Sequence, residues 1–215
     1  ESKNTSEYKN INYNIAYSYF KLKEYDQAGD FFQAHVEAVK DDKIRLNDAY
    51  LRLGDSRFVT AKYWPAMDAY NKAIELKSID ADYAAFQKAI SYGFVTKNDK
   101  KIDDLNKLIA TYSKSQYRDD ALFELGNTYV AEKNYDLAIK TYDQLLTEFK
   151  KGSYASKSIL RQGLIYYNTE KDDLAIAKFK KVAAEFPKSP EALEAVSTAR
   201  IIYVDNGKVD EYATW

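Results

Sequence analysis

The feature that most constrains the fold of this chain is a short motif that recurs at an almost constant interval. Alanine followed four residues later by an aromatic residue occurs as Ala28/Phe32, Ala66/Tyr70, Ala138/Tyr142 and Ala175/Phe179. The successive alanines are 38, 72 and 37 residues apart, and 72 is twice 36. A diverged copy is therefore expected between the second and the third, with Lys101 at its small-residue position. Self-similarity at this period indicates a stack of repeated supersecondary units.

A second motif lies about twelve residues before each alanine. It is clearest as Leu125-Gly126-Asn127-Thr128-Tyr129, and it is repeated at 163–166, with weaker copies at Leu53-Gly54 and 15–19. Apolar residues around both motifs recur at helical spacing, whereas strand-like alternation is missing. Small residues in two consecutive helices allow their backbones to approach, so we expect Gly or Ala of the first helix to face Ala of the second. The pattern therefore predicts a series of helical hairpins.

The two motifs together, with Pro187 after Phe186, resemble the consensus of the tetratricopeptide repeat. The resemblance implies an all-α fold, a right-handed superhelical solenoid of antiparallel hairpins that spans residues 1–215. Short polar turns separate the helices, and their Asp residues suit a helix start. Pro65 suits an early helix position, because the first-turn N–H groups of a helix have no intrahelical partner. The expected hairpins are 5–40, 44–77, 80–113, 117–149 and 153–186, with a partial sixth at 189–213.

Charge and composition exclude several classes of function. Lys and Arg number 32, Asp and Glu number 33, and the two kinds are mixed along the chain, so no basic face for binding nucleic acid is expected. Cysteine is absent, which removes disulfides, thiol nucleophiles and cysteine-type zinc sites. Apolar runs are far shorter than the roughly 18 residues of a membrane span, so no direct membrane insertion is expected. No cofactor-binding motif is present in the sequence, so no cofactor is expected to bind.

Two kinds of residue could carry chemistry, and both have a simpler interpretation. His35 is the only histidine, and without further ligands at metal-site spacing it is expected to pack in the core or at a hairpin edge. Paired carboxylates such as Asp41-Asp42, Asp103-Asp104, Asp119-Asp120 and Asp172-Asp173 lie mostly near expected helix starts, where they cap amides and complement the helix dipole. We therefore predict no catalytic residues and no metal site.

The remaining candidate site is the inner surface, which in this family is formed by first-helix residues that point away from the hairpin partner. The candidate contacts for a partner are Tyr13, Tyr17, Phe20, Arg52, Phe58, Phe86, Phe94, Phe123, Asn127, Arg161 and Tyr167, with Leu51, Asp55, Ile90 and Leu164 among them on the same surface. Aromatic side chains are enriched at interfaces, and a phenol adds a hydrogen-bonding tip. The same residues can instead pack against the next hairpin, because a tight superhelix shelters part of this surface.

The preferred hypothesis is a non-catalytic scaffold that binds a partner protein or peptide along an aromatic concave groove. The alternative is an architectural array whose inner surface is filled by its own side chains and whose ends or convex face make the contacts. Relatives that grip a C-terminal carboxylate use Lys and Asn one turn apart on successive first helices. Here the matching pairs, such as Tyr13/Tyr17 and Leu51/Asp55, lack that clamp. Arg52, Asn127 and Arg161 can still contact a ligand backbone or carboxylate.

Two further expectations concern the ends of the chain and its location. The last repeat has only Val209 to Trp215 where a full second helix should run, and the first helix presents Ile11, Ile15 and Tyr19. We expect the native protein to continue beyond one or both ends, and the segment alone to self-associate through its uncapped ends, with Tyr212 and Trp215 as a partial cap. The run of repeats also resembles long tetratricopeptide proteins of bacterial cell envelopes, which implies a periplasmic or envelope-associated location.

Overall fold

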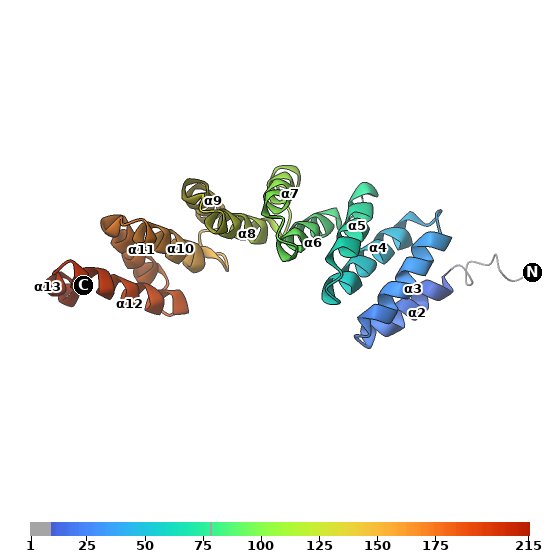
Figure 1. Ribbon diagram of the computed structural model, residues 1–215, viewed down its shortest axis with the longest axis horizontal. Helices are drawn as coiled ribbons and strands as arrows, with labels where there is room; N and C mark the ends of the chain where they lie inside the picture. The colour runs from blue at the N-terminus through green and yellow to red at the C-terminus, as the bar shows by residue number, and fades with distance from the viewer. Residues whose placement is uncertain (1–9, 78) are drawn as a thin grey trace, which may run out of the picture. The chain divides into compact units, whose positions relative to one another are not determined.

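The computed structural model describes residues 10–77 and 79–215, and every regular element within them is an α-helix (Figure 1). Contacts among the helices divide the chain into two compact units, Glu1–Tyr117 and Arg118–Trp215, and each unit is described by itself. The expected all-α fold of helical hairpins is confirmed. The continuity of residues 1–215 as a single solenoid stays a prediction.

Unit 1 contains three helical hairpins in its described part. The first pairs α2 (Ile11–Lys21) with α3 (Tyr25–Ala38), the second α4 (Lys43–Val59) with α5 (Tyr63–Glu75), and the third α6 (Ala81–Phe94) with α7 (Asn98–Thr111). Each second helix also packs on the first helix of the next hairpin, α3 on α4 and α5 on α6. This stacking buries apolar faces that a single hairpin could not cover.

Unit 2 repeats the arrangement. The pairs are α8 (Arg118–Ala131) with α9 (Tyr135–Glu148), α10 (Ala155–Asn168) with α11 (Asp172–Glu185), and α12 (Pro190–Asp205) with the short α13 (Val209–Thr214). The expected hairpin boundaries agree with both units to within two residues, except at the first helix. Its expected start at residue 5 lies outside the described residues, and α2 begins at Ile11.

Every hairpin turn has the same three-residue form. The middle residue is left-handed in each turn: Lys23, Ala61, Thr96, Lys133, Glu170 and Gly207, with φ between 56° and 68°. The N–H of the next residue bonds back into the preceding helix, as from Glu24 to the Tyr19 carbonyl at 2.9 Å. This is the pattern of a Schellman cap, which ends one helix and reverses the chain. Glycine is preferred at such a position, yet only one of these turns has it.

The core of each of the first five hairpins combines a small residue with a large one sixteen residues later. The pairs are Ala16/Phe32, Gly54/Tyr70, Ala89/Leu105, Gly126/Tyr142 and Gly163/Phe179, and all five large side chains are fully buried. The sequence predicted that Gly would face Ala of the second helix. The structure places the aromatic ring nearest instead: a Cβ added to Gly54 would lie 2.5 Å from Cε1 of Tyr70. The ring needs that space because it fills the helix crossing.

The diverged third repeat is confirmed by this spacing. Leu105 takes the ring position four residues after Lys101, and α7 packs on α6 as the other second helices pack on their partners. His35 is fully buried, as expected, with its ring 5.2 Å from that of Tyr13. Of the paired carboxylates, Asp42 caps α4 by accepting from the Arg45 N–H at 3.1 Å. Asp103 and Asp104 lie in the middle of α7, where Asp104 pairs with Lys88 at 3.2 Å.

Candidate protein-binding face

The candidate face consists of the sequence-predicted contacts on the first helices of the hairpins, and we call it the first-helix face. In unit 1 it carries Tyr13, Tyr17, Phe20, Arg52, Phe58, Phe86 and Phe94 from α2, α4 and α6. In unit 2 it carries Phe123, Asn127, Arg161 and Tyr167 from α8 and α10. Most of these residues contact other side chains of the chain, through hydrogen bonds and ion pairs in one part of the face and through stacked rings in another.

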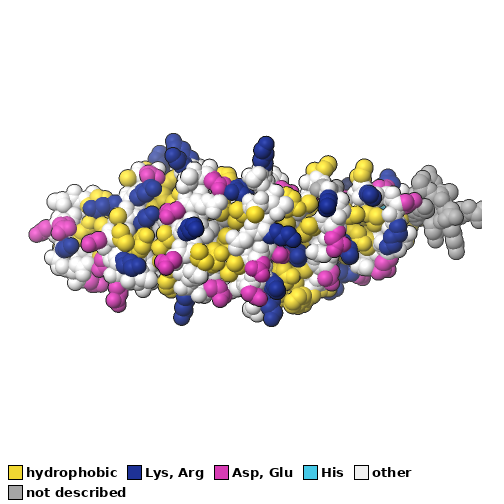
Figure 2. All heavy atoms as spheres, turned by 90° about the horizontal axis from the view of Figure 1, so that it is seen from above, with side chains coloured by type: hydrophobic (Ala, Val, Ile, Leu, Met, Phe, Trp, Pro, Cys, Tyr) yellow, Lys and Arg dark blue, Asp and Glu magenta, His cyan; other side chains and the backbone are white. Residues whose placement is uncertain are grey.

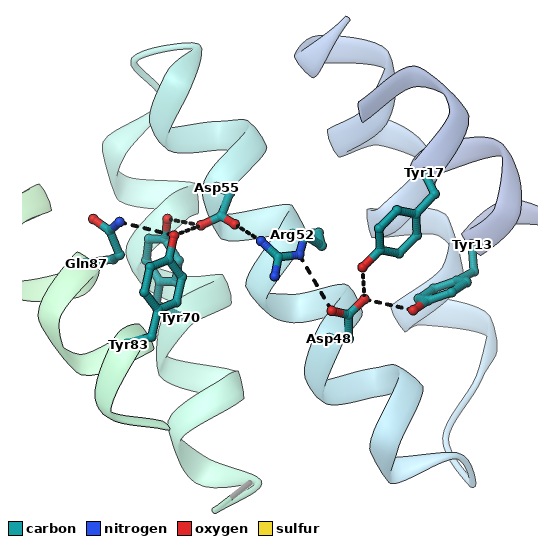
Figure 3. A network of polar contacts seen from close by, with 8 residues as sticks. All are labelled: Tyr13, Tyr17, Asp48, Arg52, Asp55, Tyr70, Tyr83 and Gln87. Carbon is teal, nitrogen blue, oxygen red and sulfur yellow. Dashed lines mark hydrogen bonds and ion pairs between the residues drawn. The ribbon is translucent and has the colours of Figure 1, made fainter. Parts of the chain in front are cut away.

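In unit 1 a polar network joins the first two hairpins (Figure 3). The hydroxyl of Tyr13 donates to Asp48 Oδ2 at 2.8 Å, and the hydroxyl of Tyr17 donates to the same oxygen. Arg52, one turn further along α4, lies 3.6 Å from Asp48 Oδ1. The carboxylate of Asp48 therefore holds α2 against α4 through two phenols, and the guanidinium shares its charge.

The network continues into the third hairpin. Arg52 also donates to Asp55 Oδ2 at 2.6 Å. The other oxygen of Asp55 accepts from Tyr70 at 2.9 Å and from Tyr83 at 2.7 Å, and the Tyr83 hydroxyl accepts from Gln87 at 3.1 Å. One continuous chain of hydrogen bonds and ion pairs thus links α2, α4, α5 and α6 (Figure 3).

Burial controls the protonation of this network. It raises the pKa of Tyr13, Tyr70 and Tyr83 well above the usual range, and the nearby carboxylates add to the effect, so the phenols stay neutral donors. Burial also raises the pKa of Asp55, although its donors oppose that shift. Burial alone would lower the pKa of Arg52, but Asp55, Tyr17 and Asp48 together outweigh it and the pKa is raised. The Arg52 guanidinium therefore lies between two carboxylates, and each of their oxygens is already engaged by a phenol or by the guanidinium itself.

This arrangement changes the interpretation of Arg52. The sequence suggested that its side chain could contact a partner's backbone or carboxylate. The structure engages it with Asp48 and Asp55, and places the Phe20 ring 5.8 Å below the guanidinium. A carboxylate from a partner would meet two acids already beside the arginine, so Arg52 serves mainly to tie the hairpins together.

The aromatic residues further along the face stack across hairpins. Phe86 lies against Tyr117 with ring centroids 5.8 Å apart, and Phe123 lies against Tyr154 at 4.5 Å, both nearly parallel. The two pairs are equivalent, because each member is 37 residues from its counterpart. Sequence reasoning missed Tyr117 and Tyr154, but their spacing of 37, which matches that of Phe86 and Phe123, was the signal that could have found them.

The remaining predicted contacts are of three kinds. Phe58 and Phe94 join Tyr63 in a three-ring cluster, and Phe94 is 56% exposed. Asn127 accepts a hydrogen bond from the buried Tyr142 at 2.7 Å, as Asp55 does from Tyr70. Arg161 is exposed, whereas Tyr167 is half-buried against the core of unit 2.

No three His, Cys, Asp or Glu side chains among the described residues are grouped to hold a metal ion, and none of the helices described is long and apolar enough to cross a membrane. Figure 2 shows basic and acidic side chains interspersed with hydrophobic ones over the face that it presents, without a single-sign patch. The arrangement is suited to contact between proteins.

Comparison with known proteins agrees with this geometry. Models of the tetratricopeptide repeat match residues 10–38, 120–151 and 157–189. No curated protein matches the chain significantly. The crystal structure of MamA protein is similar with a TM-score of 0.70 and 21% identity, over 86% of this chain and 94% of that one.

Two further solved structures are similar. A tetratricopeptide repeat protein from Parabacteroides merdae ATCC 43184 has a TM-score of 0.70 and 16% identity, over 96% of this chain and 76% of that one. YrrB, described as a tetratricopeptide protein with an unusual peptide-binding site, has a TM-score of 0.62 and 18% identity, over 85% and 88%. At these identities the likeness shows the fold alone. The family-model matches therefore show tetratricopeptide repeats at residues 10–38, 120–151 and 157–189, and the hairpin fold of both units agrees with them.

Proposed function

We propose that this chain is a non-catalytic scaffold that binds a segment of a partner protein along its first-helix face. The observation that supports the proposal is the aromatic character of that face in both units, where Tyr17, Phe86 and Phe123 stay partly exposed after they pack on neighbouring hairpins. Rigid rings with one open face offer apolar contact at little entropic cost. The fold is one of interaction scaffolds, and no enzymatic family is indicated.

A second candidate function is favoured by a specific observation. The polar network joins the three hairpins of unit 1, and ring stacks engage Phe86 and Phe123, so part of the face is filled by the chain's own side chains. In an architectural array of this kind, partners would contact the second helices or the ends. Exposed apolar residues on second helices, such as Trp64 on α5 and Leu174 on α11, are then the candidates.

The experiment that separates the two is capture of partners by three versions of the whole chain. The first combines Tyr17→Ala, Phe86→Ala and Phe123→Ala; the second combines Trp64→Ala and Leu174→Ala. The third is a control, Ile44→Ala, at a site that is 83% exposed on α4. Cross-linking in an extract and mass spectrometry identify the partner, and circular dichroism checks helicity.

Binding by the first-helix face requires that the triple variant loses the partner while it keeps its helices. Retention of the partner by the triple variant, with loss in the second variant, would transfer the function to the second helices. A cell-envelope location and self-association through the end faces remain parts of the proposal. Fractionation of cells tests the former, and the mass in solution at several concentrations tests the latter.

A further inference from the structure

The turns of the three hairpins in unit 1 lie along one edge, which we call the unit 1 turn edge. It comprises residues 20–28, 58–66 and 93–101, from the end of each first helix to the first turn of the second. Lys62 reaches from the second turn to Asp26 after the first, with Nζ 2.7 Å from Oδ1. Phe94 stacks on Tyr63 with centroids 4.8 Å apart, which joins the third turn to the second. The three turns therefore form a continuous surface.

This edge combines an exposed ring with positive charge. At the position of Phe20 and Phe58 the third hairpin has Gly93, and the ring of the next residue, Phe94, turns towards Phe58 and Tyr63. More than half of Phe94 remains open to solvent. The edge holds six lysines against three acids, an excess of three positive charges: Lys21, Lys23, Lys62, Lys97, Lys100 and Lys101 against Glu24, Asp26 and Asp99.

The corresponding edge of unit 2 has the opposite charge. We call residues 130–138, 167–175 and 204–212 the unit 2 turn edge. Its acids are Glu132, Asp136, Glu170, Asp172, Asp173, Asp205, Asp210 and Glu211, against Lys133, Lys171 and Lys208, which leaves an excess of five negative charges. Asn206 donates to Asp172 at 2.9 Å, so the last two turns are also in contact.

A hollow of about 420 Å³ opens on this acidic edge. Tyr135, Ile139, Ile165 and Tyr166 supply its apolar lining. Its charged lining is balanced, with Glu132 and Asp136 beside Lys133 and Lys171, so the negative excess belongs to the rest of the edge around the hollow. This edge complements the unit 1 turn edge. Its apolar recess can receive the exposed ring of Phe94, and its carboxylates can pair with the lysines. The chain as a whole has a net charge of only −1, so this separation of charge between two edges with the same place in the fold is not a result of composition.

We propose that the unit 1 turn edge of one copy of this chain binds the unit 2 turn edge of a second copy. Phe94 and its neighbouring rings contact the hollow, and the lysines pair with the carboxylates around it. Complementary charge steers such association and excludes like edges from each other. The contact uses the turns and not the end faces, and it would make the chain self-assembling. It shares residues with the first-helix face, among them Phe94 and Phe58, but not Tyr17, Phe86 or Phe123.

A charge exchange between two variants tests the proposal. One variant carries Lys97→Glu and Lys100→Glu; the other carries Glu170→Lys and Asp173→Lys, and lysine is already native at the turn position of Glu170 in Lys23 and Lys133. All four sites are exposed, and circular dichroism checks that each variant folds. The matched control for the lysine variant, Lys43→Glu with Lys114→Glu, makes the same change in net charge as that variant at exposed sites away from both turn edges.

Sedimentation equilibrium at low salt gives the association constants. We expect the wild type and the control to associate, each exchange variant alone to associate at least about tenfold more weakly, and an equimolar mixture of the two to recover association. Added salt should weaken the association of every sample that associates. Phe94→Ala in the wild-type background should lower the association constant by about tenfold or more.

A wild type that stays monomeric at every concentration would overturn the proposal. So would a charge variant that associates like the wild type, or a mixture that recovers nothing. Association that survives every charge change but disappears with Tyr17→Ala, Phe86→Ala and Phe123→Ala would assign the contact to the first-helix face instead. Failure of either proposal is therefore recognisable without the other.

Discussion

The substitution Gly54→Ala tests the packing on which each hairpin depends. The new Cβ would lie 2.5, 2.6 and 2.8 Å from Cε1, Cδ1 and Cζ of Tyr70, whereas carbon atoms in contact prefer roughly 3.5–4.0 Å. Tyr70 is fully buried, and its hydroxyl is held 2.9 Å from Asp55, so the ring has little room to withdraw. Overpacking of this kind costs about 1–3 kcal/mol.

An opposing effect must be subtracted. Alanine is better than glycine inside a helix by about 1 kcal/mol. The first hairpin also accommodates Ala16 against the fully buried Phe32, so a small shift of the helices is feasible. We therefore expect Gly54→Ala to lower the free energy of unfolding by about 1 kcal/mol, the balance between overpacking and helix propensity.

The matched control is Gly93→Ala in the same unit. There the nearest atom to the new Cβ is Cδ of the Lys101 side chain at 3.3 Å, and that flexible chain can move. Helix propensity should dominate, so this variant should gain about 0.5–1 kcal/mol. Urea denaturation followed by circular dichroism measures both, with equal slopes as the check that stability alone has changed.

A second change locates the cause. Tyr70→Leu with Gly54→Ala reproduces the pair Ala89/Leu105 of the third hairpin, which is fully buried. If the ring causes the loss, the double variant should lose less than the sum of the single variants, with a coupling of about 0.5–3 kcal/mol. The reasoning is refuted if Gly54→Ala proves as stable as Gly93→Ala, or if the two changes simply add.

Three further predictions follow from single contacts. Thr96→Gly should raise the free energy of unfolding by about 1 kcal/mol, because a β-branched residue is strained at φ 56°; thermal denaturation with unchanged or reduced stability would contradict this. Tyr142→Phe with Asn127→Leu, the combination found at Phe179 and Leu164, should cost less than the single changes predict, by about 1 kcal/mol in a double-mutant cycle, since neither hydrogen-bonding partner is then left unpaired. Arg118 donates to Glu148 at 2.6 and 2.9 Å, which lowers the pKa of Glu148 below 4.5. The stability advantage of the wild type over Glu148→Gln should therefore be complete above pH 4.5 and disappear as the pH falls through the lowered pKa. A stability advantage that does not depend on pH in urea denaturation would contradict the pairing.

The repeat spacing was enough to predict which segments are helical and how they pair. It placed the diverged copy at Lys101 and started the partial sixth repeat at residue 189, one residue before α12 begins at Pro190. It could not predict that Gly54 contacts the ring of Tyr70 and not Ala66, because the rotation of one helix against the other decides which of two neighbouring side chains fills the crossing.

The sequence indicated where the candidate face lies, but not which of its side chains are engaged by neighbouring hairpins. Its residues could be selected because the first-helix positions follow from the alignment of the repeats. Whether a side chain at such a position is free depends on what the next hairpin brings to it. Arg52 is engaged by two carboxylates and Phe123 is stacked on Tyr154, whereas Phe94 stays exposed because Gly93 leaves the usual ring position vacant.

The sequence by itself therefore determined the class of fold and the hairpins, since both are encoded in periodicity along the chain. The tertiary structure decided which polar groups are consumed within the protein and which surfaces remain open. Residues such as Tyr13, Asp48 and Tyr83 lie on three different hairpins, and only the stacking of those hairpins makes them one network. The physical reason is that a hydrogen bond or ring contact depends on distances of a few ångströms between helices, which no spacing within one repeat specifies.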